Sequence, residues 1–216
     1  MLSTPVHSSK DKTLKSLYAR FADRWHQGVL RLGYIAAYDQ LVADDVDKRI
    51  SPVGPVFDAG TGTGAFALSF VQRHPEVTQL TLLDMSPEML AQAVENLHAK
   101  DVETIPRVGA LGTNELAPNT YGTILCAHVI EHTEAPEEHL RWFCSRLTKG
   151  GTLLLSVSKP HWCTAIVRWR WGHKAYPPHQ VLKMLEDAGF EEISEIRFKS
   201  GPPSRTSCGY RAKRPV

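Results

Sequence analysis

The sequence predicts an α/β fold in which a doubly wound, mostly parallel sheet carries helices on both faces. Short apolar segments typical of buried strands alternate with amphipathic segments of helical length along residues 52–190. Two further strand-like segments at the C-terminus predict an antiparallel hairpin. A length of 216 residues, with 42% hydrophobic and 22% charged residues, suits one globular domain. In such a fold, ligands bind at the carboxyl ends of the parallel strands.

The sequence predicts a helical arm over residues 1–50. Residues 52–216 are expected to form the sheet and its helices, and both parts belong to one domain. Apolar side chains recur in the arm at steps of three and four residues and so share one helical face. They are Leu14, Leu17, Tyr18, Phe21, Trp25 and Val29. Gly28 and Gly33 are expected to break the helix. Tyr18 and Trp25 are candidates for a lid that covers the site and contacts the substrate.

The core elements follow in chain order from apolar runs and helix signals. Strands are expected at 55–60, 78–84, 104–108, 121–129 and 150–158. Helices are expected at 65–73, 87–99, 136–147 and 179–190. Ser86 and Pro87 supply an N-cap and a first-turn proline for the helix at 87–99. The C-terminal hairpin pairs residues 191–198 with 207–213 across a Gly-Pro-Pro turn.

A glycine-rich turn with an acidic neighbour follows the first strand. The segment VFDAGTGTG has Gly60, Gly62 and Gly64 at alternate positions, and Asp58 lies two residues before the first of them. Glycine turns of this kind usually bind phosphate at the N-terminus of the next helix. A carboxylate there would repel a pyrophosphate, so Asp58 indicates a cationic ligand.

A second acidic residue, Asp84, ends the next strand. Gly60-x-Gly62-x-x-Ala65 fits the dinucleotide fingerprint, and Asp84 lies at a suitable distance downstream to bind ribose hydroxyls. S-adenosylmethionine carries a ribose and an ammonium group but no phosphate. Its ammonium group would be drawn to Asp58, and its ribose would bind Asp84.

Four segments in this order resemble the class I S-adenosylmethionine-dependent methyltransferases. They are VFDAGTGTG, LTLLDMSPEML, YGTILCAHVIEH and RLTKGGTLLLSVS, and the resemblance covers roughly residues 52–200. The chain is similar to the small-molecule branch that includes ubiquinone and menaquinone biosynthesis enzymes. The resemblance implies a Rossmann-like fold, S-adenosylmethionine as cofactor and in-line methyl transfer to a small molecule. The acceptor atom (oxygen, nitrogen, sulfur or carbon) stays open.

Carried over by position, the resemblance implies which residues bind the cofactor. Asp58, Ala59, Gly60 and Gly62 match the loop around the methionine part, and Asp84 matches the acid that binds the ribose.

Further along the chain, Met85 matches the apolar neighbour of the adenine, and Ala127 and His128 match the segment beneath the cofactor. Relatives often read Gly-Asp-Ala after the third strand, whereas this chain reads Gly109-Ala110-Leu111. Backbone groups of Ala110 and Leu111 are therefore expected to contact the adenine in place of a carboxylate.

Two histidines after the fourth strand are candidates for catalysis. Residues four apart on a helical turn share a face, so His128 and His132 are expected to point together into the cleft. A hydroxyl or acidic carbon acceptor must lose a proton, and His132 is the candidate base. A thiolate, tertiary amine or carboxylate acceptor needs none. The alternative is that both histidines only pack or cap.

The segment KPHWCTAIVRWRWGHKAYPP, residues 159–178, follows the fifth strand and mixes arginine with tryptophan. His161 and Trp162 are candidates for substrate contacts, beside Tyr18 and Trp25. The pattern fits a pocket for an acidic or aromatic substrate, a surface helix, or an amphipathic contact with a membrane surface that holds a lipid or quinone-like substrate.

Other function classes are less compatible with these residues. A NAD(P)-dependent oxidoreductase is the alternative that the fingerprint leaves open, but Asp58 and the lack of a Tyr-x-x-x-Lys pair disfavour it. Nucleic-acid and protein amide methyltransferases usually carry an Asn/Asp-Pro-Pro-aromatic motif where this chain reads CAHVIEH. A non-catalytic partner protein is disfavoured by the complete glycine loop and both acids.

Charge and composition limit the partners. A formal net charge of +2 does not favour nucleic acid, and four scattered cysteines indicate neither a metal site nor a disulfide framework. The sequence shows no signal-peptide pattern and no apolar run of membrane-spanning length. We expect a cytoplasmic enzyme with a small-molecule substrate; the sequence does not predict the oligomeric state.

Overall fold

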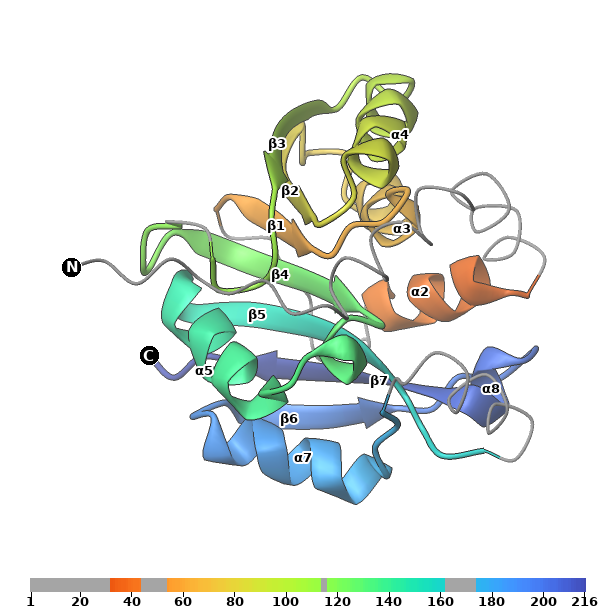
Figure 1. Cartoon of the computed structure of the whole chain (residues 1–216), viewed down its shortest axis with the longest axis vertical. Coiled ribbons are helices and arrows are strands. Elements are labelled where there is room, and N and C mark those ends of the chain that lie inside the picture. Colours follow the sequence, from red (N-terminus) through yellow and green to blue (C-terminus); the bar gives the residue numbers. More distant parts are fainter. Residues whose placement is uncertain (1–31, 44–53, 114–115, 162–173) are drawn as a thin grey trace.

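The computed structural model describes residues 32–43, 54–113, 116–161 and 174–216. Its centre is a seven-stranded sheet with the order β3-β2-β1-β4-β5-β7-β6 (Figure 1). The strands are β1 (Val56–Ala59), β2 (Gln79–Asp84), β3 (Glu103–Val108), β4 (Tyr121–Ala127), β5 (Leu147–Ser158), β6 (Glu191–Ile196) and β7 (Ser207–Lys213). Strands β1 to β5 pair in parallel, whereas β7 pairs antiparallel with both β5 and β6. The predicted doubly wound, mostly parallel sheet with a C-terminal antiparallel hairpin is confirmed.

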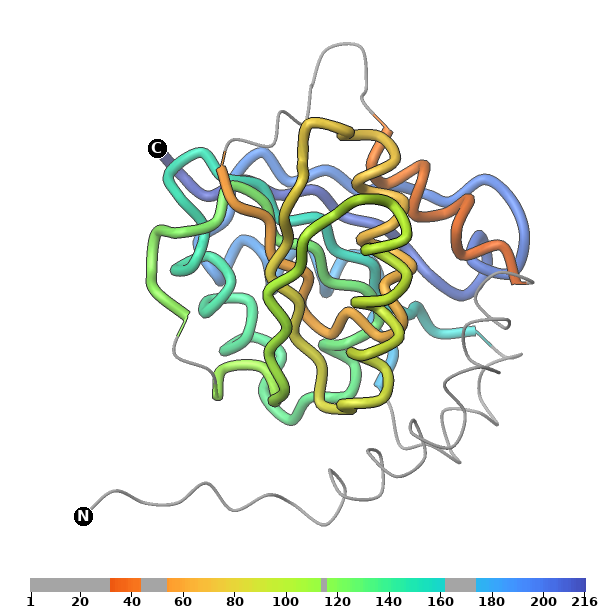
Figure 2. The backbone as a smooth tube through the Cα atoms, turned by 90° about the horizontal axis from the view of Figure 1, so that it is seen from above, coloured from red at the N-terminus to blue at the C-terminus, as the bar shows by residue number. Residues whose placement is uncertain are grey.

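Helices cover both faces of this sheet. They are α2 (Tyr34–Val42), α3 (Ala65–Arg73), α4 (Pro87–His98), α5 (Pro136–Arg146), α7 (Pro178–Asp187) and α8 (Pro203–Thr206), with the 3-10 helix η1 (Ile130–His132). Figure 2 shows α2, α3 and α4 along one side of the strands and α5 along the other. The helix N-cap predicted at Ser86 is present, because its side chain accepts a hydrogen bond from the Met89 N–H at 3.2 Å.

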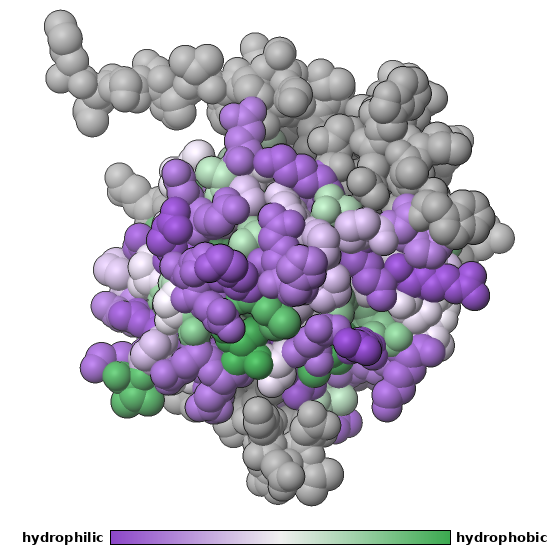
Figure 3. Space-filling model, turned by 90° about the horizontal axis from the view of Figure 1, so that it is seen from below, coloured by the Kyte–Doolittle hydropathy of each residue, from purple (hydrophilic) through white to green (hydrophobic). Residues whose placement is uncertain are grey.

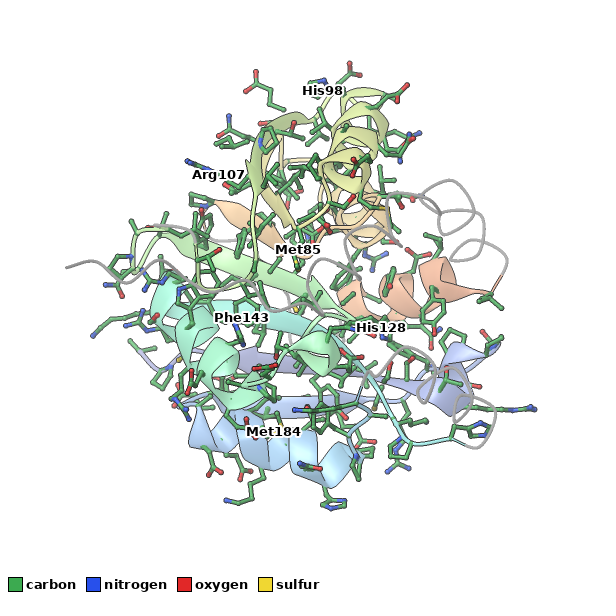
Figure 4. The ribbon with its side chains drawn as sticks, viewed as in Figure 1. Met85, His98, Arg107, His128, Phe143 and Met184 are labelled. Atoms are coloured by element: carbon green, nitrogen blue, oxygen red, sulfur yellow. The ribbon has the colours of Figure 1, made fainter. Side chains whose placement is uncertain are left out.

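Alternate strand residues fill two hydrophobic cores, one on each face of the sheet. In β4, Leu125 packs with side chains of α2, α3 and α4, while its neighbour Ile124 packs with side chains of α5 and α7. Phe143 of α5 and Met184 of α7, both labelled in Figure 4, belong to the second core. Burial on both faces explains why the central strands read as continuous apolar runs.

Three boundaries differ from the sequence prediction. β5 begins at Leu147, before the two glycines expected to start it, because Leu147 pairs with Tyr121 across a register shift in β4. β4 ends at Ala127, two residues early. The connection between β6 and β7 holds α8 as well as the Gly-Pro-Pro sequence, so it is longer than a tight turn.

Helix α2 is the part of the predicted N-terminal arm that the structure describes. Gly33, at φ 80°, precedes it, as expected for a helix break. The Arg211 guanidinium of β7 donates to the carbonyl oxygens of Leu41, at 2.9 Å, and Ala43. A cation at the C-terminus of a helix is favourable, and these contacts hold α2 against the sheet. Tyr18 and Trp25, the predicted lid residues, lie outside the described residues.

The described residues form no large apolar area on the face shown in Figure 3. Figure 3 shows mostly hydrophilic side chains on the face seen from below, with small, separated hydrophobic areas. Across the described ranges, no helix combines the length and apolar character needed to cross a bilayer.

Candidate active site

Parallel pairing brings several predicted site residues to one edge of the sheet. β1 lies between β2 and β4, so their carboxyl ends meet there. Asp58 and Ala59 lie at the end of β1, Asp84 ends β2, and Ala127 ends β4. Figure 4 shows Met85 just beyond β2 and His128 just beyond β4.

The glycine turn after β1 is fixed to β2 and open on one side. The N–H groups of Gly60 and Thr61 both donate to the Leu83 carbonyl oxygen, at 2.8 and 2.9 Å. A Cβ at Gly60 would lie 2.3 Å from Val129 Cγ2, whereas a Cβ at Gly62 would meet no atom within 4 Å. Both glycines also have positive φ angles, 74° and 54°, which favour glycine. The loop thus packs tightly at Gly60 and leaves open space at Gly62.

Asp58 is a buried carboxylate that has no counter-ion among the described residues. It is 1% exposed, and its hydrogen-bond donor is the Thr61 hydroxyl at 2.7 Å. Burial raises the pKa of Asp58 to about 7, and the negative charge of Asp84 adds to this, while the Thr61 hydrogen bond lowers it. Among the described residues, no Lys, Arg or His forms an ion pair with it. The site therefore holds a carboxyl group whose charge a bound cation would stabilise.

Asp84 connects the glycine turn to the start of α4. Its Oδ2 accepts from the Gly62 N–H at 2.8 Å, and its Oδ1 accepts from the Ser86 N–H at 2.9 Å. Burial raises the pKa of Asp84, and hydrogen bonds from the backbone of Ser86, Gly62 and Met85 counteract part of that rise. Each carboxylate oxygen has a second lone pair, so the oriented group can still accept hydrogen bonds from a ligand.

The loop after β3 lies next to Asp84. The Gly109 N–H donates to the Asp84 carbonyl oxygen at 2.9 Å. Ala110 is partly exposed and Leu111 is 9% exposed. The predicted ribose and adenine residues are thus side by side at neighbouring strand ends.

His128 is held by contacts from strand β5 and helix α2. Its backbone has φ 57°, a left-handed conformation that is unusual for a residue with a side chain. Ring atom Nε2 lies 3.2 Å from the Ser156 hydroxyl, and Nδ1 lies 3.2 Å from the Ser158 hydroxyl. The Tyr34 ring of α2 packs edge-on against the His128 ring, with centroids 5.2 Å apart. These contacts fix the His128 ring at the carboxyl end of β4.

Glu131 is a functional candidate to which the sequence assigned no role. It is 1% exposed, and its Oε1 accepts from the Ser158 N–H at 2.6 Å and lies 3.2 Å from His128 Nδ1. Burial alone would raise the pKa of Glu131, but the hydrogen bond and charge of His128, the Ser158 N–H and the charge of His132 outweigh it and lower the pKa to about 2. Glu131 is thus a buried anion at neutral pH.

The predicted helical turn that would place both histidines on one face is wrong. The helix η1 begins at Ile130, and His128 precedes it in a left-handed conformation. His132 is the last residue of η1 and is partly exposed, and its N–H donates to the Val129 carbonyl oxygen at 3.0 Å. The side chain of His128, like that of His132, is partly exposed.

Helix α2 adds two aromatic side chains that the sequence analysis did not select. Tyr34 contacts His128, and the Tyr38 ring lies 4.8 Å from that of Phe66 in α3. Burial raises the pKa of Tyr38, as do the negative charges of Asp58 and Glu131. The spacing of four residues within YIAAYDQLV was the available signal, since it puts both rings on one helical face.

The predicted substrate contacts are described only in part. His161 lies just beyond β5 and is partly exposed. Trp162, like Tyr18 and Trp25, lies outside the described residues.

Similarity to known proteins was found in sequence and in structure. A family model described as a methyltransferase domain matches residues 18–195. A ubiquinone biosynthesis O-methyltransferase of Xanthomonas euvesicatoria pv. vesicatoria is 27% identical over 220 residues, which cover 90% of each chain. One of the same name from Xanthomonas campestris pv. campestris is 27% identical over 144 residues, 65% of this chain; there the chain spans 58% of its relative's length.

Among solved structures, a SAM-dependent methyltransferase of Thermotoga maritima, titled as a possible histamine N-methyltransferase, is similar with a TM-score of 0.68. It is 16% identical, and the match covers 93% of this chain and 99% of that one. At this identity the likeness shows a common fold.

Proposed function

We propose that this chain, which belongs to the methyltransferase domain family, takes S-adenosylmethionine as its cofactor and transfers the cofactor's methyl group to a hydroxyl oxygen of a small molecule. The observation that carries the proposal is the Asp58 carboxyl group, 1% exposed and without a described counter-ion beside an open glycine turn. A dinucleotide would place a pyrophosphate against this group, which electrostatics disfavours. The ammonium group of S-adenosylmethionine would stabilise it.

Neighbouring residues fit the rest of this ligand. Asp84 is oriented by backbone N–H groups, and its carboxylate has acceptor capacity left for ribose hydroxyls. Met85 borders the adenine, and backbone groups of Ala110 and Leu111 contact its edge. At the methionine end, Ala59 and Gly60 lead into the turn, and Gly62 gives the ligand room close to the backbone.

Two residues after β4 complete the cofactor site. Ala127 ends the strand, and His128 follows it with both ring nitrogens close to side chains of the protein. Because these contacts occupy its ring, we assign His128 to binding and not to proton transfer.

His132 is the proposed catalytic base. When bound, S-adenosylmethionine supplies a methyl carbon already activated by its sulfonium. The chain must bring the acceptor hydroxyl in line, exclude water and remove its proton. His132 is partly exposed and directly follows the buried carboxylate of Glu131 in the chain.

The choice of acceptor is supported by the names of the curated relatives. A relative that matches 90% of this chain is named an O-methyltransferase, and oxygen acceptors are among those that need a base. His161 and the residues Tyr18, Trp25 and Trp162 stay candidates for contacts with this small-molecule substrate.

The proposal is tested with methyl-labelled S-adenosylmethionine and a panel of small hydroxyl compounds and metabolite extracts, with the products identified by mass and fragmentation. Asp84→Ala serves as the inactive control, because it removes the ribose acceptor. We expect label in an O-methyl product for the wild type only.

Label on nitrogen, sulfur or carbon would overturn the oxygen acceptor and leave methyl transfer. If S-adenosylhomocysteine binds by calorimetry but no substrate in the panel or the extracts is labelled, catalysis by this chain is contradicted. Binding of NAD in preference to S-adenosylhomocysteine would support the oxidoreductase alternative.

A further inference from the structure

The glycine turn after β1 packs against the segment that follows β4. Gly60 directly follows β1, and Val129 is the second residue after β4, the parallel strand beside β1. A Cβ at Gly60 would lie 2.3 Å from Val129 Cγ2 and 3.1 Å from Val129 Cγ1. The side chain of Val129 therefore occupies the space that any side chain at Gly60 would need.

This contact is made where the turn is already fixed to the sheet. The Gly60 N–H donates to the Leu83 carbonyl oxygen of β2 at 2.8 Å. Two residues further along, a Cβ at Gly62 would meet no atom within 4 Å. Val129 thus packs on the closed part of the turn, while the space for a ligand lies at Gly62.

Val129 is tied equally closely to the residues that follow it. It directly precedes the 3-10 helix η1, and its carbonyl oxygen accepts from the His132 N–H at 3.0 Å. Ile130, the first residue of η1, is 0% exposed and belongs to the core that α5 covers. Since η1 is a single turn, a displacement of Val129 would move His132 with it.

The residue before Val129 limits its movement in the other direction. The His128 N–H donates to the Ser156 carbonyl oxygen of β5 at 2.9 Å. Val129 itself is partly exposed and packs against the same core as Ile130. The side chain of Val129 is therefore the link between the turn that carries Gly60 and the turn that carries His132.

We propose that Val129 is a positioning residue for methyl transfer: by packing on Gly60, it sets where His132 lies relative to the methyl group of the bound cofactor. The inference rests on the proposed function, because it takes the glycine turn as the cofactor site and His132 as the base. Val129 has no polar side-chain atom, so it acts through distance alone. A misplacement of about 1 Å can lower a rate roughly a hundredfold.

Truncation of Val129 is the first test. Val129→Ala removes both γ-carbons, so we expect kcat to fall about tenfold while S-adenosylhomocysteine affinity stays within about threefold of the wild-type value. Val129→Ile keeps both γ-carbons and is the matched control, with kcat within about threefold. Labelled S-adenosylmethionine, with the hydroxyl compound that the wild type methylates, gives kcat, and calorimetry gives the affinity.

The same truncation in a His132→Gln background separates positioning from a general structural role. If Val129 acts through His132, Val129→Ala should lower kcat by less than about twofold once the imidazole is absent. A structural role would lower kcat by the same factor in both backgrounds.

A rescue experiment tests the contact itself. Gly60→Ala should weaken S-adenosylhomocysteine binding at least about tenfold, because its Cβ would overlap Val129, and the loss should shrink to about threefold in the Val129→Ala background. Gly62→Ala is the control: its φ of 54° is also left-handed, but its Cβ would not approach Val129, so its effect should be the same in both backgrounds. If Gly60→Ala does not fold, recovery of a folded protein in the Val129→Ala background is the predicted rescue, measured by circular dichroism.

The outcomes separate this inference from the proposed function. A near-normal kcat for Val129→Ala, an equal loss with and without His132, or a loss of S-adenosylhomocysteine affinity in place of kcat would show that Val129 does not position His132. No rescue of Gly60→Ala would contradict the contact. Methyl transfer would stand in each of these cases. Failure of the wild type to bind S-adenosylhomocysteine, or to label any product, would overturn the proposed function and this inference with it.

Discussion

Asp58 and Glu131 are two carboxylic acids with the same exposure and opposite pKa shifts. Each is 1% exposed, and they lie at the carboxyl ends of the adjacent parallel strands β1 and β4. The pKa of Asp58 is raised to about 7 because burial is opposed mainly by one hydroxyl donor. The pKa of Glu131 is lowered to about 2, because His128, the Ser158 N–H and the charge of His132 outweigh burial.

The difference separates a binding group from a structural one. Oε1 of Glu131 already has hydrogen-bond partners in the free protein, so the carboxylate is stabilised there before any ligand arrives. No cationic side chain among the described residues pairs with Asp58. A cationic ligand would therefore form an ion pair that the protein alone does not provide. On this view Asp58 controls cofactor affinity, while Glu131 controls the geometry and charge around His128 and His132.

The largest effect is expected at the histidine beside Glu131. His132→Gln should lower kcat by roughly 10² to 10⁴-fold, because it removes the base, while S-adenosylhomocysteine affinity stays near the wild-type value. Stopped-time assays with labelled cofactor across pH 5 to 9, and calorimetry, measure the two quantities; His179→Gln, at an exposed position, is the control. A near-normal kcat with an unshifted pH profile would remove His132 from proton transfer and leave positioning as the chain's contribution.

Asp58→Asn should show the opposite pattern, with a loss in binding. Removing one partner of a buried charge pair should weaken S-adenosylhomocysteine binding by about a hundredfold at pH 8. The same change should raise the free energy of unfolding of the ligand-free protein at pH 8 by at least about 1 kcal/mol, since the uncompensated charge is gone.

Calorimetry and urea unfolding measure both effects, with the exposed Asp39→Asn as the matched control. Unchanged affinity would mean that the ammonium group binds elsewhere. Lower stability at pH 8 would mean that Asp58 has a compensating partner in the protein.

Glu131→Gln should destabilise the ligand-free protein by about 2 kcal/mol at pH 7, because the charge that pairs with His128 and the Ser158 N–H is lost. Urea unfolding measures it, and Glu138→Gln on the exposed surface of α5 is the control. A gain in stability, like the one expected for Asp58→Asn, would erase the distinction between the two carboxyl groups.

The two groups should also give opposite slopes of stability with pH. The Asp58 carboxyl keeps its proton to about pH 7 when folded but loses it near its usual value of 3.8 when unfolded, so stability falls as pH rises between these values. Glu131 keeps its charge down to about pH 2 when folded, compared with its usual 4.5, so its contribution is lost as pH falls from 4.5 toward 2.

Urea unfolding from pH 3 to 8 is the measurement. Asp58→Asn should flatten the decline between pH 4 and 7, and Glu131→Gln should flatten the fall below pH 4.5. If Asp58→Asn instead flattened the fall below pH 4.5 and Glu131→Gln the decline between pH 4 and 7, the two pKa shifts would be assigned to the wrong residues.

Asp58 could be selected from the sequence, but the contacts of Glu131 could not. Asp58 and Asp84 each interrupt or end an apolar strand beside a turn signal, which is a local pattern. Glu131 accepts from the Ser158 N–H of β5, and its other partner, His128, contacts the Ser156 hydroxyl of the same strand, so this arrangement depends on the pairing of β4 with β5. The left-handed backbone of His128 has no local signal either, because glycine or asparagine would be the usual residue there.

The sheet itself followed from local patterns for the same reason. Each central strand is apolar enough, and each helix amphipathic enough, to be recognised alone. The start of β5 at Leu147 was missed, because it depends on a register shift opposite Tyr121 and not on propensity; two glycines inside a strand argue against the observed structure locally.

The smallest expected effect separates backbone strain from charge at His128. A residue with a Cβ in the left-handed region costs about 1 kcal/mol more than glycine, so His128→Gly should be more stable than His128→Ala by about that amount. Neither replacement has a ring to pair with Glu131, so the same difference should appear when both are made in the Glu131→Gln background. Urea unfolding of the four proteins measures this difference.

Equal stability of the Gly and Ala variants would mean that the backbone leaves the left-handed conformation once the ring is removed. The contacts of the His128 ring with Glu131, Ser156 and Ser158 would then be what holds the backbone in that conformation. A difference that disappears only in the Glu131→Gln background would instead make the Glu131 carboxylate responsible for the strain at His128. Backbone strain at His128 and the charge of Glu131 would then be one coupled effect, and the comparison with Asp58 could no longer treat the charge of Glu131 by itself.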